Sequence, residues 1–486
     1  MFAKTVGFSF SVALPLLLVR RLDQVQFGLY KQVFLVVGTA VNLLPLAFSM
    51  SAFYYLPREP DKRPQTIFNI MAFNILVGVL ASLLLLFRPS ILTAIFREPQ
   101  LGAYAPLIGV VILTWIVGAF LEGVPIANEE IKLATKFIIG THLARACLLV
   151  MAALLFGTVR SLICAAILYG VIQIAVLVGY LQSRFKGFWH SFDLPMVRRQ
   201  FSYAIPLGSA SLLFMMQTDL HNYFVSNRFG PAIFAIYAIG TIQLPLLVLM
   251  QDATNSVLIT RVSLMQKQGQ SREIISLIAR AARKLAAIYF PVYALLMVVG
   301  PEFIKFVFTP RYQSSWPIFA VNLTLLPLGI FLPDPLVRAY ASERYFVLKL
   351  RFSIIAAMVL VFGLWTSQLG PIGVVTVVVG INFLERAAIA IHFGRLIEVE
   401  RRDIFLLKDV GKLAVACLLA GFACGILRFS IAEAAPLLIL AACGVVFATV
   451  YAASAYFMRI PTKEEYGQIR EKLARYLPPS LRYRWD

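Results

Sequence analysis

Charged residues are scarce in this chain of 486 residues. Asp, Glu, Lys and Arg make up 14% of the sequence, whereas hydrophobic residues make up 60%. Soluble domains carry about a quarter charged residues, and a soluble globule with so few would expose large apolar patches and aggregate. The scarcity of charge excludes a soluble protein, and the 38 Phe exclude a disordered chain. We therefore predict an all-α integral membrane protein.

Cysteine and histidine are also rare, with five and four residues. The cysteines lie in apolar stretches, their number is odd and none forms a CxxC pair, which excludes a disulfide framework. The histidines lack the spacing of metal ligands, and no GxxxxGK[ST] loop is present to bind a nucleotide. We therefore predict no metal site, no cofactor and no catalytic residue.

Acidic residues are fewer than basic ones, 24 against 44, which leaves a net charge of +20. In a soluble protein such an excess suggests nucleic acid as a partner, but no nucleic-acid-binding motif is present. Cytoplasmic loops of membrane proteins collect Lys and Arg. The basic excess therefore indicates a multi-pass membrane protein that binds no nucleic acid.

Apolar segments long enough to cross a bilayer, about 20 residues each, fill most of the chain. The first of them has no small-x-small cleavage site, which predicts a retained helix rather than a signal peptide. The connections are too short for a separate soluble domain. We predict about 14 transmembrane helices, near residues 2–19, 31–50, 67–87, 103–121, 137–156, 161–180, 201–222, 234–257, 285–300, 316–336, 346–366, 371–392, 410–427 and 435–457.

The distribution of basic residues predicts the orientation. With the N-terminus inside, 32 of the 44 Lys and Arg fall in cytosolic segments and ten in external ones. This bias predicts an even number of spans in the plasma membrane, or in the inner membrane of a cell with two, with both termini cytosolic. The basic segments 258–284 and 461–477 are expected to be helices on the lipid headgroups.

A weak internal repeat appears at an offset of 207 residues. It aligns five residues of the first half, from Arg21 to Ser49, with identical residues from Arg228 to Ser256. Two parallel six-helix repeats of this kind build transporters whose halves flank a central site. We predict bundles at 1–200 and 201–395, an extra helix pair at 396–457 and a basic cytosolic tail at 458–486. The offset places Phe201 before Met1, so the first helix is expected to be short or to start upstream.

Charged and polar residues at membrane depth are the candidates for function, because such groups are costly and rarely face lipid. Asp219 lies near the outer end of the seventh predicted helix. Asp252 and Asn255 lie one turn apart in the eighth, on a shared face. They predict a polar cavity wall or a cation site, the alternative being satisfied hydrogen bonds between helices.

Arg145 is the clearest buried cation of the first half. A guanidinium matches phosphate oxygens bidentately, so Arg145 is the candidate for binding an anion, with snorkelling to the headgroups as the alternative. Asp334, Glu385 and Arg386 are further charges within predicted helices. Glu385 and Arg386 are adjacent and point to different sides of their helix, so they cannot simply pair.

Two sequence stretches carry a resemblance to a known family. Arg20-Arg21-Leu22, followed by Phe27-Gly28-Leu29-Tyr30, resembles the turn after the first helix of polysaccharide flippases. Tyr203-Ala204-Ile205-Pro206-Leu207-Gly208, followed by Asp219, Phe229-Gly230 and Ile236-Tyr237, is similar to the opening of their second half. Ala235 stands where the family has Gly. These flippases belong to the multidrug/oligosaccharidyl-lipid/polysaccharide superfamily.

The resemblance implies a flippase for a polyprenyl-diphosphate-linked oligosaccharide, working by alternating access in surface polysaccharide biosynthesis. It implies a cationic cavity, coupling to an H⁺ or Na⁺ gradient, and a polysaccharide polymerase and glycosyltransferases as partners. Few cations lie within the predicted helices here, and Arg145 is the main one. The substrate and ion candidates are thus Arg145, Asp219, Asp252 and Asn255.

Two other classes compete with the flippase. A cation-coupled multidrug or metabolite antiporter of the same fold would share the helices and the repeat. An integral-membrane glycosyltransferase or polymerase would need acidic residues or a sizeable domain in its external loops, and these hold little beyond Asp23 and Glu302. We therefore expect a transporter and not an enzyme.

Overall fold

The computed structural model describes residues 14–365 and 368–460, and no strand occurs within these ranges. Nine described helices are long and apolar enough to span a bilayer, or up to eleven if each of two bent helix pairs is one span. The all-α membrane fold is confirmed, whereas the count of 14 is not. Most of the predicted span 2–19 lies outside the described residues. The predicted span 316–336 is broken into short helices.

The first of two compact units comprises Met1–Leu249, Val307–Asn322 and Glu343–Glu385. Its main helices are α2 (Gln24–Leu43), α3 (Ser51–Arg58), α4 (Arg63–Phe87), α5 (Ser90–Phe96), α6 (Pro99–Gly118), α7 (Phe120–Ala127), α8 (Ile131–Leu155), α9 (Val159–Arg184), α10 (Leu194–Gly240), α13 (Trp316–Leu323), α16 (Arg344–Leu364) and α17 (Pro371–Leu396). The short helices η1 (Phe48–Met50), η2 (Pro60–Lys62), η3 (Phe188–His190), η4 (Pro310–Ser315) and η5 (Ala341–Glu343) connect them.

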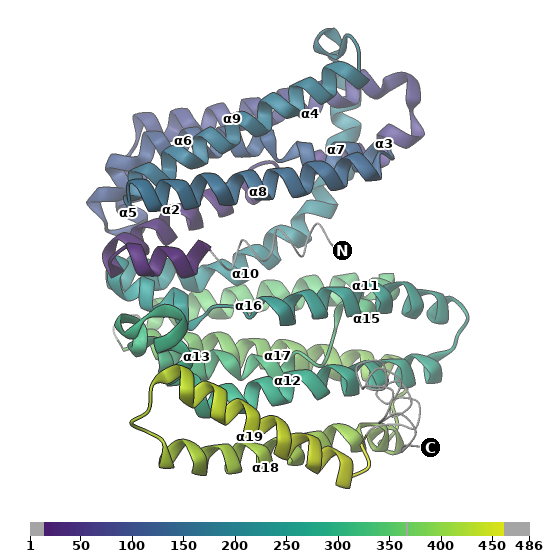
Figure 1. The fold of residues 1–486 in the computed structure, drawn as a ribbon. Helices are drawn as coiled ribbons and strands as arrows, with labels where there is room; N and C mark the ends of the chain where they lie inside the picture. Colours follow the sequence, from purple (N-terminus) through teal and green to yellow (C-terminus); the bar gives the residue numbers. More distant parts are fainter. Residues whose placement is uncertain (1–13, 366–367, 461–486) are drawn as a thin grey trace, which may run out of the picture. The chain divides into compact units, whose positions relative to one another are not determined.

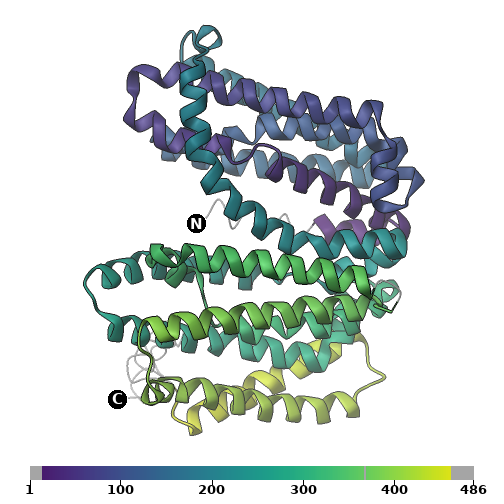
Figure 2. The same ribbon diagram turned by 180° about the vertical axis from the view of Figure 1, so that it is seen from behind.

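Within the first unit, α4 packs against α6, α6 against α9 and α9 against α8, and α2 lies between α6 and α10. The four helices α4, α6, α8 and α9 run side by side in both views (Figures 1 and 2). One apolar core forms around Phe48, Leu121 and Phe188. A second forms where α10 meets α16 and α17, around Tyr237 and Met358.

The second unit comprises Met250–Phe306, Leu323–Ser342 and Arg386–Asp486. Its helices are α11 (Pro245–Lys267), α12 (Ser271–Phe308), α14 (Leu325–Leu328), α15 (Asp334–Ala339), η6 (Arg401–Leu407), α18 (Lys408–Ser430) and α19 (Pro436–Phe457). The hairpin of α18 and α19 packs through buried Cys424, Cys443 and Phe447 onto Val299 of α12. The predicted bundles 1–200 and 201–395, the pair 396–457 and the tail 458–486 stay predictions.

Capping residues start several helices earlier than the apolar runs predicted. The Asp23 carboxylate accepts a hydrogen bond from the Gln26 amide at 2.8 Å and opens α2 seven residues before the predicted span. Thr158 caps α9 and Asp193 caps α10 in the same way. A side-chain oxygen at this position satisfies an amide that the helix leaves unpaired. The caps thereby bring polar residues into the spans.

The chain bends sharply after α2. α2 and the segment after it, Phe48–Arg58, meet at 47°. Leu46 and Ala47, which follow Pro45, both have left-handed backbones, with φ of 50° and 56°. Such residues cost about 1–3 kcal/mol each and cluster at functional sites. A second pair, Leu212–Gly240 and Pro245–Lys267, is bent by 56° across the interruption at 241–244.

Two glycines let α2 and α10 approach closely. A Cβ on Gly28 would lie 1.9 Å from the carbonyl oxygen of Pro231, and a Cβ on Gly208 would lie 2.9 Å from that of Leu46. Gly28 and Gly208 belong to the two family-like stretches. Those stretches therefore lie at the contact between α2 and α10. Gly230, with φ of 75°, ends the straight part of α10 just before Pro231.

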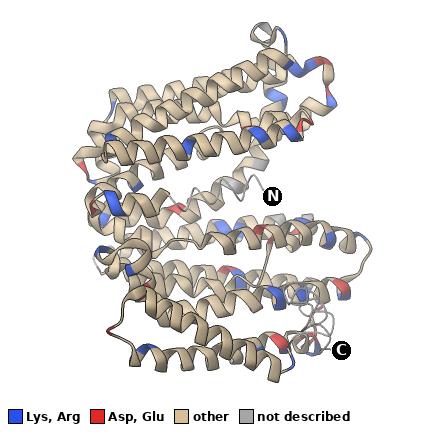
Figure 3. Ribbon diagram, in the orientation of Figure 1, with Lys and Arg blue, Asp and Glu red and all other residues tan. Residues whose placement is uncertain are grey.

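Charged residues lie mainly near the ends of the helices in both units (Figure 3). Apolar side chains such as Leu80, Phe87 and Leu155 are widely exposed along α4 and α8, with 57%, 74% and 70% of their surface accessible. Exposed apolar helix surface between charged ends is what contact with lipid requires. The chain is a multi-pass membrane protein.

Candidate functional site

Arg145 lies midway along α8, in the first unit. Its guanidinium stands over the ring of Trp115 on α6, 4.4 Å from the ring centroid. Trp115 is fixed in turn, because its indole nitrogen donates to the Ala166 carbonyl at 3.0 Å. Among the described residues no carboxylate lies within ion-pair distance of Arg145. The guanidinium is thus held by an aromatic ring, and its donors are free of an acidic partner.

An aromatic cluster surrounds this arginine. Trp115 contacts Phe34 of α2 at 5.8 Å and Tyr169 of α9 at 5.6 Å between ring centroids. Phe34 also contacts Tyr30, one turn earlier on α2, at 4.8 Å. Helices α2, α6, α8 and α9 therefore converge on one aromatic region that contains a guanidinium.

A second cation lies on α2 close to this cluster. The ammonium nitrogen of Lys31 is 5.5 Å from the ring centroid of Phe27, and the side chain is half-buried. Lys31 is among the ten Lys and Arg that the basic-residue count assigns to external segments, because the predicted span 31–50 begins there. The Asp23 cap moves the start of α2 back to Gln24, so Lys31 lies about two turns into the helix. Lys31 and Arg145 therefore both lie within helices that contact this aromatic cluster.

Asp219 lies on α10 at the contact with α2. The hydroxyl of Thr39 donates to its carboxylate at 3.4 Å. Seven residues earlier on α2, the amide nitrogen of Gln32 donates to the Ser226 hydroxyl at 2.7 Å in a buried contact. These pairs lie between the close approaches at Gly28 and Gly208 and give α2 and α10 an antiparallel register. The structure thus connects Asp219 to the same helix that contacts Arg145's aromatic cluster.

Glu385 of α17 forms a polar cluster with α10 and α16. The Gln217 amide donates to one of its carboxylate oxygens at 2.6 Å, and the Arg351 guanidinium lies 3.8 Å from the other. The side chains of Arg351 and Glu385 are 19% and 13% exposed. Arg351 is among the 32 Lys and Arg that the basic-residue count assigns to cytosolic segments, but the structure places it within α16. Charged residues within membrane-spanning helices usually pair in this way, because an unpaired charge there is costly.

Asp252 and Asn255 lie on α11, in the second unit. The Asp252 side chain is exposed, whereas the amide oxygen of Asn255 is buried and accepts no hydrogen bond from the described residues. A buried acceptor without a partner costs about 1–3 kcal/mol. Asn255 is thus a candidate to bind a donor or a cation, with Asp252 on the same face. Arg145 and Asp219 lie in the first unit, whereas Asp252 and Asn255 lie in the second.

Arg386 has a structural role in the second unit. Its guanidinium donates to the carbonyl oxygens of Leu328 and Phe331, the latter at 3.0 Å. Leu328 is the last residue of α14 and Phe331 follows it, and the Leu328 carbonyl also accepts from the Phe331 amide at 3.3 Å. Glu385 and Arg386 bind different partners, as their adjacency on one helix predicts. Asp334 begins α15 in this region.

The described residues contain no group of three or more His, Cys, Asp or Glu side chains that could hold a metal ion. The five cysteines are free thiols. Cys424 and Cys443 lie in contact between α18 and α19, each sulfur 3.8 Å from the other residue's carbonyl oxygen. They pack as small apolar residues.

A family model described as "Polysaccharide biosynthesis protein" matches residues 17–317, well over half of the chain. The chain belongs to this family. The match includes Arg145, Asp219, Asp252 and Asn255, and both family-like stretches. No curated protein matches the sequence. The resemblance inferred from those stretches is thereby confirmed.

Solved structures show the fold of this polysaccharide biosynthesis protein. A lipid II flippase MurJ in an inward closed conformation superposes with a TM-score of 0.72 at 12% identity, covering 94% of this chain and 97% of that one. An inward-facing multidrug resistance MATE family transporter of the MOP superfamily gives 0.60 at 15% identity, covering 83% and 96%. An outward-facing one gives 0.55 at 16%, covering 84% and 95%.

The contacts of Arg386 give a prediction for this family member. Replacing Arg386 with Leu removes the hydrogen bonds that its guanidinium donates to the Leu328 and Phe331 carbonyls, and a hydrogen bond to a charged group contributes about 1.5–3 kcal/mol. We expect a lower thermal unfolding temperature for the detergent-solubilised Arg386→Leu variant. Arg395→Leu, at the exposed end of the same helix, is the control. Equal unfolding temperatures for the two variants would show that the broken segment does not depend on Arg386.

Proposed function

We propose that this chain flips a polyprenyl-diphosphate-linked oligosaccharide across the plasma membrane for surface polysaccharide biosynthesis. The observation that carries the proposal is Arg145, a guanidinium at membrane depth with an aromatic support and no carboxylate partner among the described residues. The family and the fold shared with flippases and transporters support it. Transport of this kind needs no catalytic step and no cofactor.

In the proposed mechanism Arg145 and Lys31, the two cations beside the aromatic cluster, bind the diphosphate. Arg145 donates bidentately to phosphate oxygens, and Lys31 adds a second positive charge. The aromatic cluster offers faces on which sugar rings stack, while the polyprenyl tail stays in lipid. Alternating access then exposes the site to each side of the membrane in turn.

The remaining candidates would bind the coupling ion, and the gradient of that ion would drive transport. We assign Asp219, Asp252 and Asn255 to the polar wall of the cavity or to a site for a coupling ion, H⁺ or Na⁺. A carboxylate exposed on an apolar helix, as at Asp252, rarely faces lipid and is expected to face water. Glycosyltransferases would supply the substrate and a polymerase would receive it. Two six-helix bundles, 1–200 and 201–395, would be the moving halves.

A cation-coupled antiporter for drugs or metabolites is the second candidate. The likeness of the fold to multidrug resistance MATE family transporters favours it. An antiporter for cationic drugs would need acidic residues where the substrate binds, whereas the cluster around Trp115 contains a guanidinium and an ammonium group. The local charge therefore favours an anionic substrate.

Binding of a polyprenyl diphosphate tests the proposal. We expect polyprenyl diphosphate to raise the unfolding temperature of the purified protein more than polyprenyl monophosphate does, because only the diphosphate offers oxygens to two cations. Arg145→Ala should remove most of the difference. Stabilisation by cationic drugs, with none by the diphosphate, would support the antiporter instead.

The orientation gives a separate prediction. The basic bias places the α11–α12 turn in the cytosol and η4 outside, where Ser314 is exposed. In a cysteine-free background, a membrane-impermeant maleimide added to whole cells should label Ser314→Cys and leave Gln268→Cys unlabelled. Both should react after the cells are permeabilised. Labelling of Gln268→Cys but not of Ser314→Cys in intact cells would show that the protein has the opposite orientation.

A further inference from the structure

The segment between α17 and α18 exposes apolar side chains just before the long helix α18 begins. The short helix η6 has the sequence Arg-Arg-Asp-Ile-Phe-Leu-Leu and is followed by Lys408. Its four apolar side chains, which we call the η6 surface, are 64%, 78%, 44% and 42% exposed at Ile404, Phe405, Leu406 and Leu407. Exposed apolar residues this closely spaced indicate a partner.

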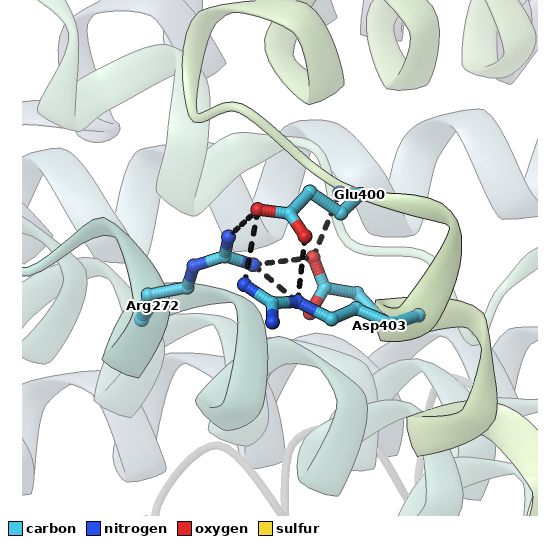
Figure 4. Close-up of polar contacts among 4 residues, drawn as sticks. Arg272, Glu400 and Asp403 are labelled. Carbon is cyan, nitrogen blue, oxygen red and sulfur yellow. Dashed lines mark hydrogen bonds and ion pairs between the residues drawn. The ribbon is translucent and has the colours of Figure 1, made fainter.

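Two acidic residues beside the η6 surface, Glu400 and Asp403, are held in ion pairs. Glu400 and Asp403 are occupied by Arg272 at the start of α12, with the Asp403 carboxylate 2.9 Å from the Arg272 guanidinium (Figure 4). The Arg402 guanidinium lies 2.6 Å from Glu400. Glu400 and Asp403 also cap each other's backbone amides. These ion pairs hold the acidic groups at the base of η6.

The basic groups that flank the η6 surface have no acidic partner. Arg401 and Lys408 are exposed, and no described carboxylate lies within ion-pair distance of either; Asp409 pairs with Lys412 at 3.4 Å. Glu398 is the one nearby acid left without a described ion pair. The segment thus presents apolar side chains between two available cations, the pattern of an interfacial membrane anchor.

The position of η6 indicates that the partner of its exposed apolar side chains is the lipid bilayer. It is continuous with α18, and the run Arg401–Ser430 is apolar enough to span a bilayer. α17, which precedes it, is also a candidate span. A short connection between two long helices, here 397–407, lies at the bilayer surface, where apolar side chains reach the acyl chains and cations reach the headgroups.

We propose that the η6 surface inserts into the cytosolic leaflet and that Arg401 and Lys408 bind the headgroups of anionic phospholipids. Phe405, the most exposed of the four, enters deepest. The Arg272 ion pairs connect this anchor to the first turn of α12. That end of α12 is thereby held at the same membrane surface. The anchor does not depend on the transported substrate.

Spin-label accessibility tests the anchor. A nitroxide on Phe405→Cys in a cysteine-free background, with the full chain in nanodiscs, should collide with oxygen more often and with an aqueous nickel chelate several-fold less often than one on Asp61→Cys. Asp61 is exposed in η2, between α3 and α4, and is the aqueous control. Equal nickel accessibility at the two positions would overturn the proposal.

Lipid composition tests the headgroup contact. Adding phosphatidylglycerol to phosphatidylcholine nanodiscs should lower the nickel accessibility at Phe405→Cys further. The double change Arg401→Gln and Lys408→Gln should abolish that response. The charge-matched control, Arg88→Gln with Arg160→Gln at helix ends in the first unit, should keep it. An unchanged response in the Arg401 and Lys408 variant would contradict the assignment of these two residues.

Discussion

Replacing Arg145 with Ala should reduce transport of a diphosphate-linked substrate by about 10- to 150-fold, because a charge-assisted contact contributes about 1.5–3 kcal/mol. Lys at this position keeps the charge but loses the bidentate geometry. We therefore expect Arg145→Lys to recover only part of the activity. The measurement is the initial rate of transport into proteoliposomes, normalised to the amount of reconstituted protein.

The control for Arg145 is Arg160, an exposed arginine in the first turn of α9 in the same unit. Arg160→Ala removes the same charge and should leave the rate near the wild-type value. The Arg145→Ala protein should unfold at a temperature close to that of the wild type, which separates a transport defect from misfolding. Transport by Arg145→Ala at the Arg160→Ala rate would show that Arg145 is a packing residue.

Replacing Gly28 with Val should give the largest loss of stability. The Cβ alone would lie 1.9 Å from the Pro231 carbonyl oxygen, and both groups belong to helix backbones that cannot turn aside as a flexible side chain can. Overpacking costs about 1–3 kcal/mol and occasionally more. We expect a marked fall in the thermal unfolding temperature and in the yield of monodisperse protein from membranes.

Gly38 on the same helix is the matched control. A Cβ there would have no neighbour within 4 Å, and Ala is about 1 kcal/mol better than Gly within a helix. Gly38→Ala should therefore unfold at or above the wild-type temperature. A Gly28→Val protein as stable as Gly38→Ala would mean that α2 and α10 do not pack as closely as described.

Much of the fold could be predicted because the lipid environment restricts it. Long apolar runs must be helical in a bilayer, so α4, α8, α9 and α19 lie close to their predicted ranges. The helix starts could not be predicted as well. Polar caps such as Asp23 and Asp193 lie outside the apolar runs, and only their hydrogen bonds show that the helices begin there. The left-handed backbone at Leu46 and Ala47 could not be predicted, because neither residue is a glycine.

The candidate site was predictable in part. Arg145 could be found because a lone cation within an apolar run is conspicuous. Its support by Trp115 could not, because α6 and α8 come together only through packing with α9. Lys31 was missed because it lies near a helix start, and Arg351 because its partner Glu385 is 34 residues away in sequence. Partners distant in sequence leave no local signal.

The most direct test of the central claim is transbilayer movement of the substrate itself. A polyprenyl-diphosphate-linked oligosaccharide placed in both leaflets of proteoliposomes is trimmed by a glycosidase added outside. Without movement the enzyme reaches only the outer half of the substrate. We predict that the wild-type protein exposes nearly all of it, and that Arg145→Ala slows this exposure. Protection of the inner half in the presence of the wild-type protein, with or without an ion gradient, would contradict the proposed function.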